Sequence, residues 1–139
     1  MNLSSTVYWQ VSFTQFGAFG TVNKLAVNKT FPSTATSLIF DSGSSMSYIP
    51  TKDYTLLYKT LITDQNKSCS QSSGFVYCTC SSIYDTSFLN ISLSLGGRYV
   101  FFWNSSFYLS YNAGQAKCQF NFVDMGTSDY WILGDPFLR

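Results

Sequence analysis

The feature that most constrains this chain is a run of three large apolar residues, 38–40, that leads directly into Asp41. Ser42 and Gly43 follow, and two further serines complete a glycine-centred turn that is rich in hydroxyl groups. Because burying an ionised carboxylate is costly, a buried strand does not normally end on an unpaired acid. When donors surround such an acid, a functional carboxylate is the leading interpretation. Two alternatives stay open here: Asp41 caps a helix or turn, or the segment is a phosphorylatable Asp-Ser-Gly loop.

Composition favours a β-rich domain and excludes several classes of partner. The 139 residues include 13 Phe, 10 Tyr and 3 Trp, and aromatic side chains suit a half-buried pleated sheet. The net charge is +1 with no basic run, so nucleic acid and anionic membranes are poor candidate partners. No apolar stretch approaches the roughly 18 residues that a membrane span needs. The N-terminus lacks the features of a signal peptide, which predicts either an upstream start or a cytosolic protein.

The residue types that are missing narrow the chemistry further. The chain has no histidine, which excludes Ser-His-Asp and Cys-His catalysis and the common zinc sites, and we predict neither a metal nor a cofactor. It has no glutamate either, so every side-chain carboxylate belongs to one of seven aspartates. Only Asp41 joins an apolar run to a glycine-hydroxyl turn. Asp124 fits a looser pattern, but Met125 offers no hydroxyl and polar Asn121 interrupts the apolar approach, so we interpret Asp124 as a loop residue.

The periodicity of the chain predicts a mostly β structure with one clear helix. Alternation predicts a strand over residues 8–13, and two glycines predict a turn over 17–20. A helix is predicted from Thr51, its expected N-cap, to about Ile62, because apolar residues recur there at helical spacing. Residues 64–74 are polar and are predicted to form a loop. The other predicted strands are 21–27, 36–40, 75–80, 88–95, 99–103, 119–123 and 130–133, with a turn at 96–97 and a short helical turn within 104–109.

The cysteines favour an oxidising compartment. Four cysteines lie in the second half of the chain: Cys69, Cys78, Cys80 and Cys118. One residue separates Cys78 from Cys80, so they do not form the two-residue spacing of redox and zinc motifs. An even number in loops and at strand ends suggests two disulfides, with four buried thiols in a cytosolic protein as the alternative. Five glycosylation sequons favour the same compartment: Asn2, Asn28, Asn66, Asn90 and Asn104.

Taken together, these features resemble the C-terminal lobe of a pepsin-like aspartic protease, the group that includes cathepsin D. The resemblance covers nearly the whole chain and rests on four landmarks in order: the strand 8–11, the active-site signature 38–45, the cysteines at 80 and 118, and the late signature 131–139. It implies half of the bilobal fold and a disulfide between Cys80 and Cys118. Cys69 and Cys78 have no counterpart in the commonest pattern, and we expect them to pair with each other.

The resemblance also implies a role for each residue of the signature. Asp41 matches the second catalytic aspartate. Ser42 matches the hydroxyl that links the two active-site loops, and Gly43 permits the tight turn and the close approach of substrate. Ser44 matches the hydroxyl that bonds the outer aspartate oxygen and keeps it ionised. Three residues would line the primed side of the cleft, with ordinary core positions as the alternative: Tyr8, Ile39 and Ile132.

Two departures from the family pattern define what else we expect. The chain has no second aspartate turn of this quality, and it stops at Arg139, where the family normally continues through one or two closing strands. We therefore expect residues 1–139 to be a C-terminal lobe without its last strands, completed by an N-terminal lobe that carries the second catalytic aspartate. The alternatives are a homodimer like the retroviral proteases, a non-catalytic lobe that binds peptides or inhibitors, and a secreted structural β domain.

The activity implied by the resemblance is that of an endopeptidase that cleaves polypeptides between apolar residues at acidic pH. Two aspartates share a proton and activate a water molecule, so no covalent intermediate, metal or cofactor is needed. The expected location is the secretory pathway, ending in a lysosome, a vacuole or the extracellular space.

Overall fold

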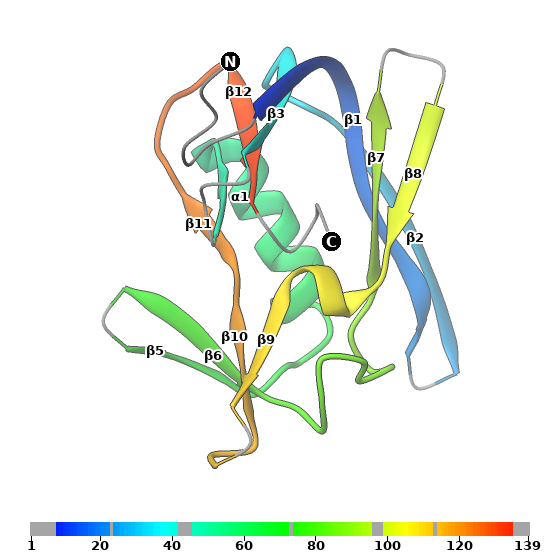
Figure 1. Cartoon of the computed structure of the whole chain (residues 1–139). Helices are drawn as coiled ribbons and strands as arrows, with labels where there is room; N and C mark the ends of the chain where they lie inside the picture. Colours follow the sequence, from blue (N-terminus) through cyan, green and yellow to red (C-terminus); the bar gives the residue numbers. More distant parts are fainter. Residues whose placement is uncertain are drawn as a thin grey trace.

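The computed structural model describes residues 8–22, 24–41, 46–72, 74–95, 99–112 and 114–134, and this part is mostly β with one α-helix, as predicted (Figure 1). The strands are β1 (Tyr8–Val22), β2 (Leu25–Pro32), β3 (Ser37–Asp41), β4 (Ser47–Ile49), β5 (Cys69–Ser72), β6 (Phe75–Thr79), β7 (Asn90–Leu95), β8 (Tyr99–Trp103), β9 (Leu109–Asn112), β10 (Lys117–Phe120), β11 (Phe122–Asp124) and β12 (Tyr130–Leu133). The helices are α1 (Thr51–Tyr58), the π-helix η1 (Lys59–Thr63) and the 3₁₀ helix η2 (Ser105–Phe107).

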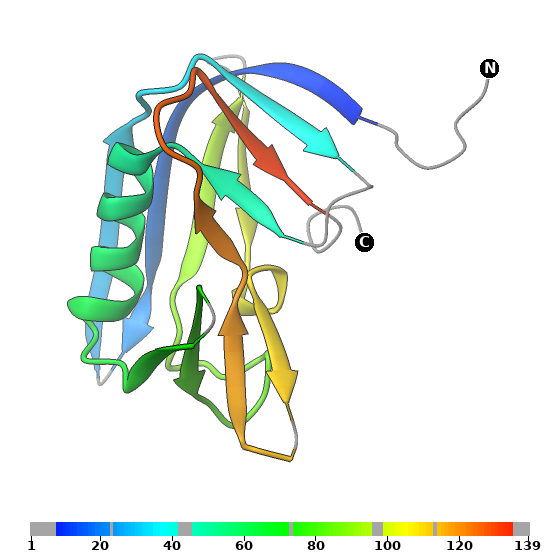
Figure 2. The same cartoon turned by 90° about the vertical axis from the view of Figure 1, so that its left-hand side faces the viewer.

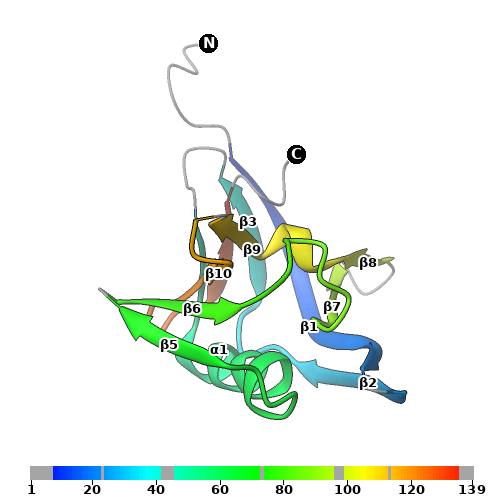
Figure 3. The same cartoon turned by 90° about the horizontal axis from the view of Figure 1, so that it is seen from below.

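The strands of the described residues form two sheets. The larger has eight strands in the order β11-β4-β12-β3-β1-β7-β8, with β2 paired to β1. The smaller has four strands in the order β5-β6-β10-β9. Only Asn121 separates β10 from β11, so one nearly continuous stretch of chain passes from the smaller sheet into the larger (Figures 1 and 3). The two sheets therefore share one hydrophobic core.

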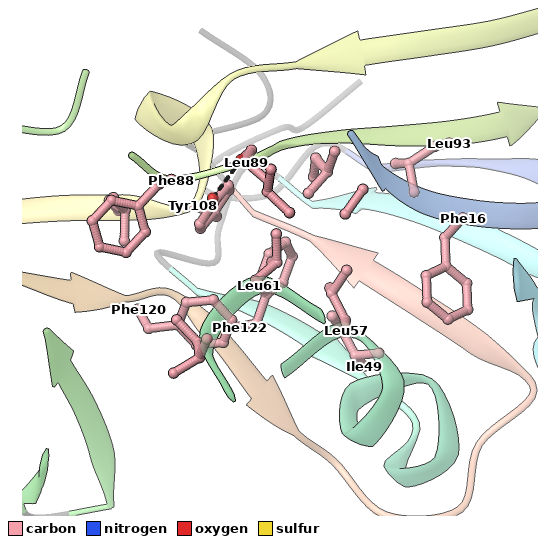
Figure 4. Close-up of a cluster of buried hydrophobic side chains, with 14 of the residues drawn as sticks. Phe16, Ile49, Leu57, Leu61, Phe88, Leu89, Leu93, Tyr108, Phe120 and Phe122 are labelled. Carbon is pink, nitrogen blue, oxygen red and sulfur yellow. Dashed lines mark hydrogen bonds between the residues drawn. The ribbon is translucent and has the colours of Figure 1, made fainter. Parts of the chain in front are cut away.

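That core lies between the helical segment 51–63 and strands of both sheets. Leu57 and Leu61 project from the helical segment among buried strand residues such as Ile49 and Phe120 (Figure 4). Tyr108 is fully buried, and its hydroxyl donates a hydrogen bond of 2.5 Å to the carbonyl of Leu89. Burial, and to a lesser extent the charge of Asp85, raises the pKa of Tyr108, so this hydroxyl stays protonated and keeps its role as donor.

The predicted turn at residues 17–20 is wrong, because β1 runs straight through it to Val22. A Cβ on Gly17 would lie 2.3 Å from the carbonyl oxygen of Lys29 on β2 and 2.9 Å from the Ser92 hydroxyl on β7. Glycine is therefore present for the close approach of neighbouring strands, not for a turn. The chain reverses direction after β1 ends at Val22, and Lys24, just before β2, has a positive φ of 67°. As a result, the predicted strand 21–27 is divided between β1 and β2.

The predicted helix is present, but its start differs from the prediction. α1 and η1 together span 51–63, so the predicted end near Ile62 is confirmed. Thr51 is the first helical residue, and Pro50 occupies the cap position without a side-chain cap bond. The Thr51 hydroxyl instead donates to the Asp124 carboxylate at 2.6 Å. It ties the start of the helix to the end of β11.

Several smaller differences concern short elements. The predicted loop 64–74 contains strand β5, which pairs with β6. The predicted strand 119–123 is interrupted at Asn121, whose N–H donates to the Tyr108 carbonyl beside β9 and whose carbonyl accepts from the N–H of Ser47 on β4. Strand β9 was not predicted, while β8 and β12 have the predicted bounds. The turn predicted at 96–97 lies outside the described residues.

Two disulfides reinforce the smaller sheet, and their pairs are those expected from the sequence. Cys69–Cys78 joins neighbouring strands β5 and β6. Cys80–Cys118 joins the segment after β6 to β10 and closes a sequence separation of 38 residues. In the chain-entropy model, such links stabilise the fold by restricting the unfolded chain.

A buried carboxylate connects three separate segments beneath the larger sheet. Asp53, in the first turn of α1, is 0% exposed. Its oxygens accept hydrogen bonds from the Ser33 hydroxyl at 2.7 Å and from the Thr34 N–H and hydroxyl at 3.1 and 3.0 Å. The Trp131 indole N–H donates to the same carboxylate at 2.8 Å. Asp53 therefore joins the loop before β3, helix α1 and strand β12.

A second hydrogen-bonded carboxylate, Asp85, organises the loop between β6 and β7. It accepts bonds from the N–H of Ser81 and from both the N–H and hydroxyl of Ser87. Partial burial disfavours its ionised form, but these hydrogen bonds and the nearby Lys67 ammonium outweigh that effect. Together they lower the pKa of Asp85 to about 2.

We expect Asp53→Asn to lower the free energy of unfolding by about 2–3 kcal/mol, because an amide NH₂ would replace one acceptor oxygen and face buried donors. Chemical denaturation of the full chain measures this change. Asp64→Asn is the matched control, since Asp64 forms a surface ion pair with Lys59 and its loss should cost no more than about 0.5 kcal/mol. Equal losses for the two variants would contradict the structural role of Asp53.

The Asp85 carboxylate predicts a pH dependence of stability. Because its folded pKa is below the unfolded value of about 3.9, its contribution is complete above about pH 4 and is lost as the pH falls toward 2. After allowance for solvent screening, we expect Asp85→Asn to cost about 1 kcal/mol at pH 6 and progressively less below pH 4. Denaturation of both proteins at pH 6 and pH 2 tests this, and a loss that is the same at both pH values would contradict it.

Candidate active site

Asp41 lies where three strands of the larger sheet meet. It is the last residue of β3, which has β1 on one side and β12 on the other. β1 is antiparallel and places the Cα of Tyr8 opposite that of Asp41, whereas β12 is parallel to β3. The carboxyl ends of β3 and β12 and the start of β1 therefore lie together at one side of the sheet (Figure 2).

The register places Asp41 on the face of the sheet that is turned away from the core. Residues directly opposite each other on neighbouring strands share a face, and alternate residues of a strand do so as well. Leu38 is opposite Trp131, and both are buried. Ile39 is opposite Ile132, and both of these side chains are half-buried on the other face, which they share with Asp41.

β4, the strand that follows β3 in the sequence, is not its neighbour in the sheet. β4 pairs with β12 on the side away from β3, so the segment 42–45 links two strands that have β12 between them. The return is anchored by Ser47, which is buried and whose hydroxyl accepts a hydrogen bond from the N–H of Gly134 at 3.2 Å. The N–H of Ser47 also donates to the carbonyl of Asn121 at 2.9 Å. Ser47 is thus held both by the residue that follows β12 and by the junction of β10 and β11.

The structure brings together some of the predicted site residues and leaves others undescribed. Asp41, Ile39 and Ile132 share one face. The backbone of Tyr8 lies opposite Asp41, but its side chain is outside the described part. Ser42, Gly43 and Ser44 also lie outside the described residues, so their roles stay predictions. The four cysteines lie in or beside the smaller sheet.

Two further residues of this face were not identified from the sequence. Gln10 is opposite Ile39 on β1, and its side chain donates to the Ser37 hydroxyl at 3.1 Å. Tyr48 is opposite Ile132 on β4. Gln10 could have been found, because strand alternation places it on the same face as Tyr8. Tyr48 could not, because the sequence predicts no strand over residues 47–49, which form β4.

Asp124, the weaker candidate, takes part in a turn. Its Oδ1 accepts hydrogen bonds from the Thr51 hydroxyl at 2.6 Å and from the N–H of Gly126 at 2.9 Å. The Gly126 carbonyl in turn accepts from the N–H of Thr51 at 3.0 Å. Asp124 is nevertheless the last residue of strand β11, where it lies opposite Ile49 of β4, so the interpretation of Asp124 as a loop residue is wrong.

The described residues were compared with the patterns of a metal-binding group and of a membrane-spanning helix. Among them, no group of three or more His, Cys, Asp or Glu side chains is placed so that it could hold a metal ion. Within the same ranges, no helix combines the length and apolar character that a membrane crossing requires. The described site offers one carboxylate, that of Asp41, beside the aliphatic side chains of Ile39 and Ile132.

Comparison with known proteins identifies the fold. The crystal structure of edgp matches with a TM-score of 0.67 and 14% identity, over 96% of this chain and 35% of that one. The crystal structure of basic 7S globulin from soybean matches with a TM-score of 0.56 and 11% identity, over 94% and 37%. The chain therefore spans little more than a third of either structure, and at these identities the likeness shows the pepsin-like fold alone.

Sequence comparison identifies the family, whereas the structural matches show only the fold. No curated protein sequence gives a significant match. The sequence model of the eukaryotic aspartyl proteases, however, matches residues 1–139, the whole chain. This match agrees with the pepsin-like fold, and we conclude that the chain belongs to the eukaryotic aspartyl protease family.

Proposed function

We propose that the protein is an aspartic endopeptidase and that this chain, its C-terminal lobe, supplies one of the two catalytic aspartates, Asp41. The observation that carries the proposal is the position of Asp41 at the end of a central strand, on the same half-buried face as Ile39 and Ile132. The second aspartate comes from an N-terminal lobe that lies outside this chain. This chain covers only 35% and 37% of the two matched structures, which leaves room for such a lobe.

The proposed mechanism follows from the behaviour of two adjacent carboxyl groups. Two like charges at close range do not both ionise readily, so the pair holds one proton between them and titrates as a unit. The ionised partner accepts a proton from a bound water, whose oxygen then attacks the carbonyl carbon of the peptide. The protonated partner supplies a proton to the substrate, and no covalent acyl-enzyme forms. This explains how a protease works without a histidine.

The chain's other residues would bind and orient the substrate. Ile39 and Ile132 offer adjacent aliphatic surface, which favours substrates with an apolar side chain next to the scissile bond. In this proposal the Ser44 hydroxyl bonds the outer oxygen of Asp41, Ser42 links the two lobes, and Gly43 leaves room for the substrate backbone.

The two disulfides support an oxidising location for this activity. We propose that the enzyme passes through the secretory pathway and acts on polypeptides in a lysosome, a vacuole or the extracellular space.

We expect Asp41→Asn to reduce acidic hydrolysis of an unfolded protein substrate by at least about 100-fold, because the amide cannot take up the water proton. Peptide release by the full-length protein, measured by mass spectrometry, tests this. Asp124→Asn is the matched control: both of its hydrogen bonds use Oδ1, an oxygen that asparagine retains. Undiminished hydrolysis by Asp41→Asn would overturn the assignment. A wild type that binds peptides and cleaves none would instead indicate a peptide-binding lobe.

We expect Ile132→Ala to lower kcat/KM by about 10-fold for peptides with a large apolar residue at the cleavage site, since lost methylene contacts weaken transition-state binding. Peptides with alanine there should be affected less. Leu25→Ala, at a 71% exposed side chain on β2, is the control. A uniform loss across both peptide sets would contradict a specificity role for Ile132.

A further inference from the structure

The face of the larger sheet that is turned away from the core has a hollow across β1, β2, β7 and β8, with a volume of about 560 Å³. Its lining includes the apolar side chains of Phe19, Val100 and Phe102 and the polar side chains of Asn28 and Thr30. The opposite face of the same strands is core, with Ala18 and Ile91 almost fully buried. A hollow of this size falls in the range of small-molecule sites, so it has room for several sugar rings.

The apolar part of this hollow is unusually exposed. Val100 and Phe102 of β8 are 52% and 63% exposed. The Phe102 ring packs edge-on against Phe19 with centroids 5.1 Å apart, which fixes it in place without burying it. Within the described residues β8 pairs only with β7 and forms an edge of the sheet. An apolar edge strand of this kind favours aggregation unless something covers it.

A glycosylation sequon lies beside these aromatic residues. Asn28, Lys29 and Thr30 are all exposed on β2, which pairs only with β1 among the described strands. Asn28 is opposite Phe19 and Thr30 is opposite Gly17, so the acceptor amide and the sequon hydroxyl share the face that carries the hollow. Both atoms needed for recognition therefore belong to the same surface as Phe102.

The other described sequons are placed differently. Asn90 is half-buried on β7, between β1 and β8, and its Nδ2 would lie 3.8 Å from a Cβ on Gly20. Asn66 and Asn104 are exposed, but each lines a different hollow, which adjoins this one at Val27 for Asn66 and at Gly20 and Thr21 for Asn104. Asn28 is the exposed acceptor among these sequons that lines the hollow containing Phe102 and Val100.

We propose that Asn28 carries an N-linked glycan whose first sugars lie in this hollow and cover Phe102 and Val100. The amide nitrogen forms a bond to the anomeric carbon of an oligosaccharide donated by a lipid diphosphate. The bond between that carbon and the diphosphate oxygen breaks, the diphosphate leaves with the electron pair, and the amide nitrogen loses one proton. The C–H faces of the sugars pack on the aromatic side chains, and their hydroxyls face water, so an apolar edge becomes a hydrated one.

The first test is the occupancy of Asn28 in the full-length protein secreted by eukaryotic cells. Mass spectrometry of glycopeptides should find the glycan on Asn28 in the wild type and in Thr30→Ser, which keeps the sequon. Thr30→Ala, which removes the sequon and keeps Asn28, should lack it. An unmodified Asn28 in the secreted wild type would overturn the proposal.

The second test asks whether the glycan covers the apolar surface. Thr30→Ala should raise the fluorescence of a hydrophobic dye by about two-fold, and adding Phe102→Ser should reverse the rise. Ser68→Ala, which removes the Asn66 sequon, is the matched control and should leave the fluorescence unchanged. If Thr30→Ala is not secreted, enzymatic removal of the glycan from the folded wild type should give the same rise.

Two outcomes of the second test would overturn the covering role. One is dye binding that does not change when the glycan is lost. The other is a glycosylated wild type that forms a dimer in gel filtration and becomes monomeric in Phe102→Ser, because a second copy would then cover the edge. Neither test measures proteolysis, so the proposed function and this inference can fail independently.

Discussion

The larger sheet depends on the hydrogen bonds of one buried carboxylate, that of Asp53. A buried charge is tolerated only when its hydrogen-bonding capacity is used, and here the loop before β3 and the indole of Trp131 together supply the donors. The three connected segments are far apart in the sequence, at 33–34, 53 and 131. The network therefore fixes α1 relative to both β3 and β12 at once. Packing alone, which is not directional, would fix their relative positions less strictly.

This network determines the orientation of the candidate active site. Because the Trp131 indole must reach Asp53 on the core side, strand alternation turns Ile132 to the other face. The parallel register then places Ile132 beside Ile39, two residues before Asp41 on the same face. A shift of one residue in β12 would bury Ile132 and expose Trp131, which the unsatisfied carboxylate would oppose. Trp131, a core residue, thus fixes which side chains of β12 and β3 face the candidate site on the opposite side of the sheet.

The sequence predicted those parts of the fold that depend on local pattern. The apolar run into Asp41, the helical spacing after Thr51 and the segment 130–133 all correspond to elements of the structure. The prediction failed where contacts with strands distant in the sequence determine the structure. Gly17 is an example, because it allows β2 and β7 to approach β1 closely and does not form a turn. Nor does the local sequence reveal the structural role of Asp53. Its donors come from segments about 20 and 80 residues away, and no local pattern encodes them.

Asp53 and Asp41 have the same side chain, but their environments give the two carboxylates different accessibility. Both oxygens of Asp53 are occupied by protein donors and shielded from solvent, so no water or substrate can reach them. Asp41 is half-buried at a strand end, on a face formed by aliphatic side chains and not by the core. A residue in that position can meet a group from outside the chain, whereas Asp53 can only hold the chain together. For the proposed function, the strands that place Asp41 on this face, β1, β3 and β12, all belong to this chain.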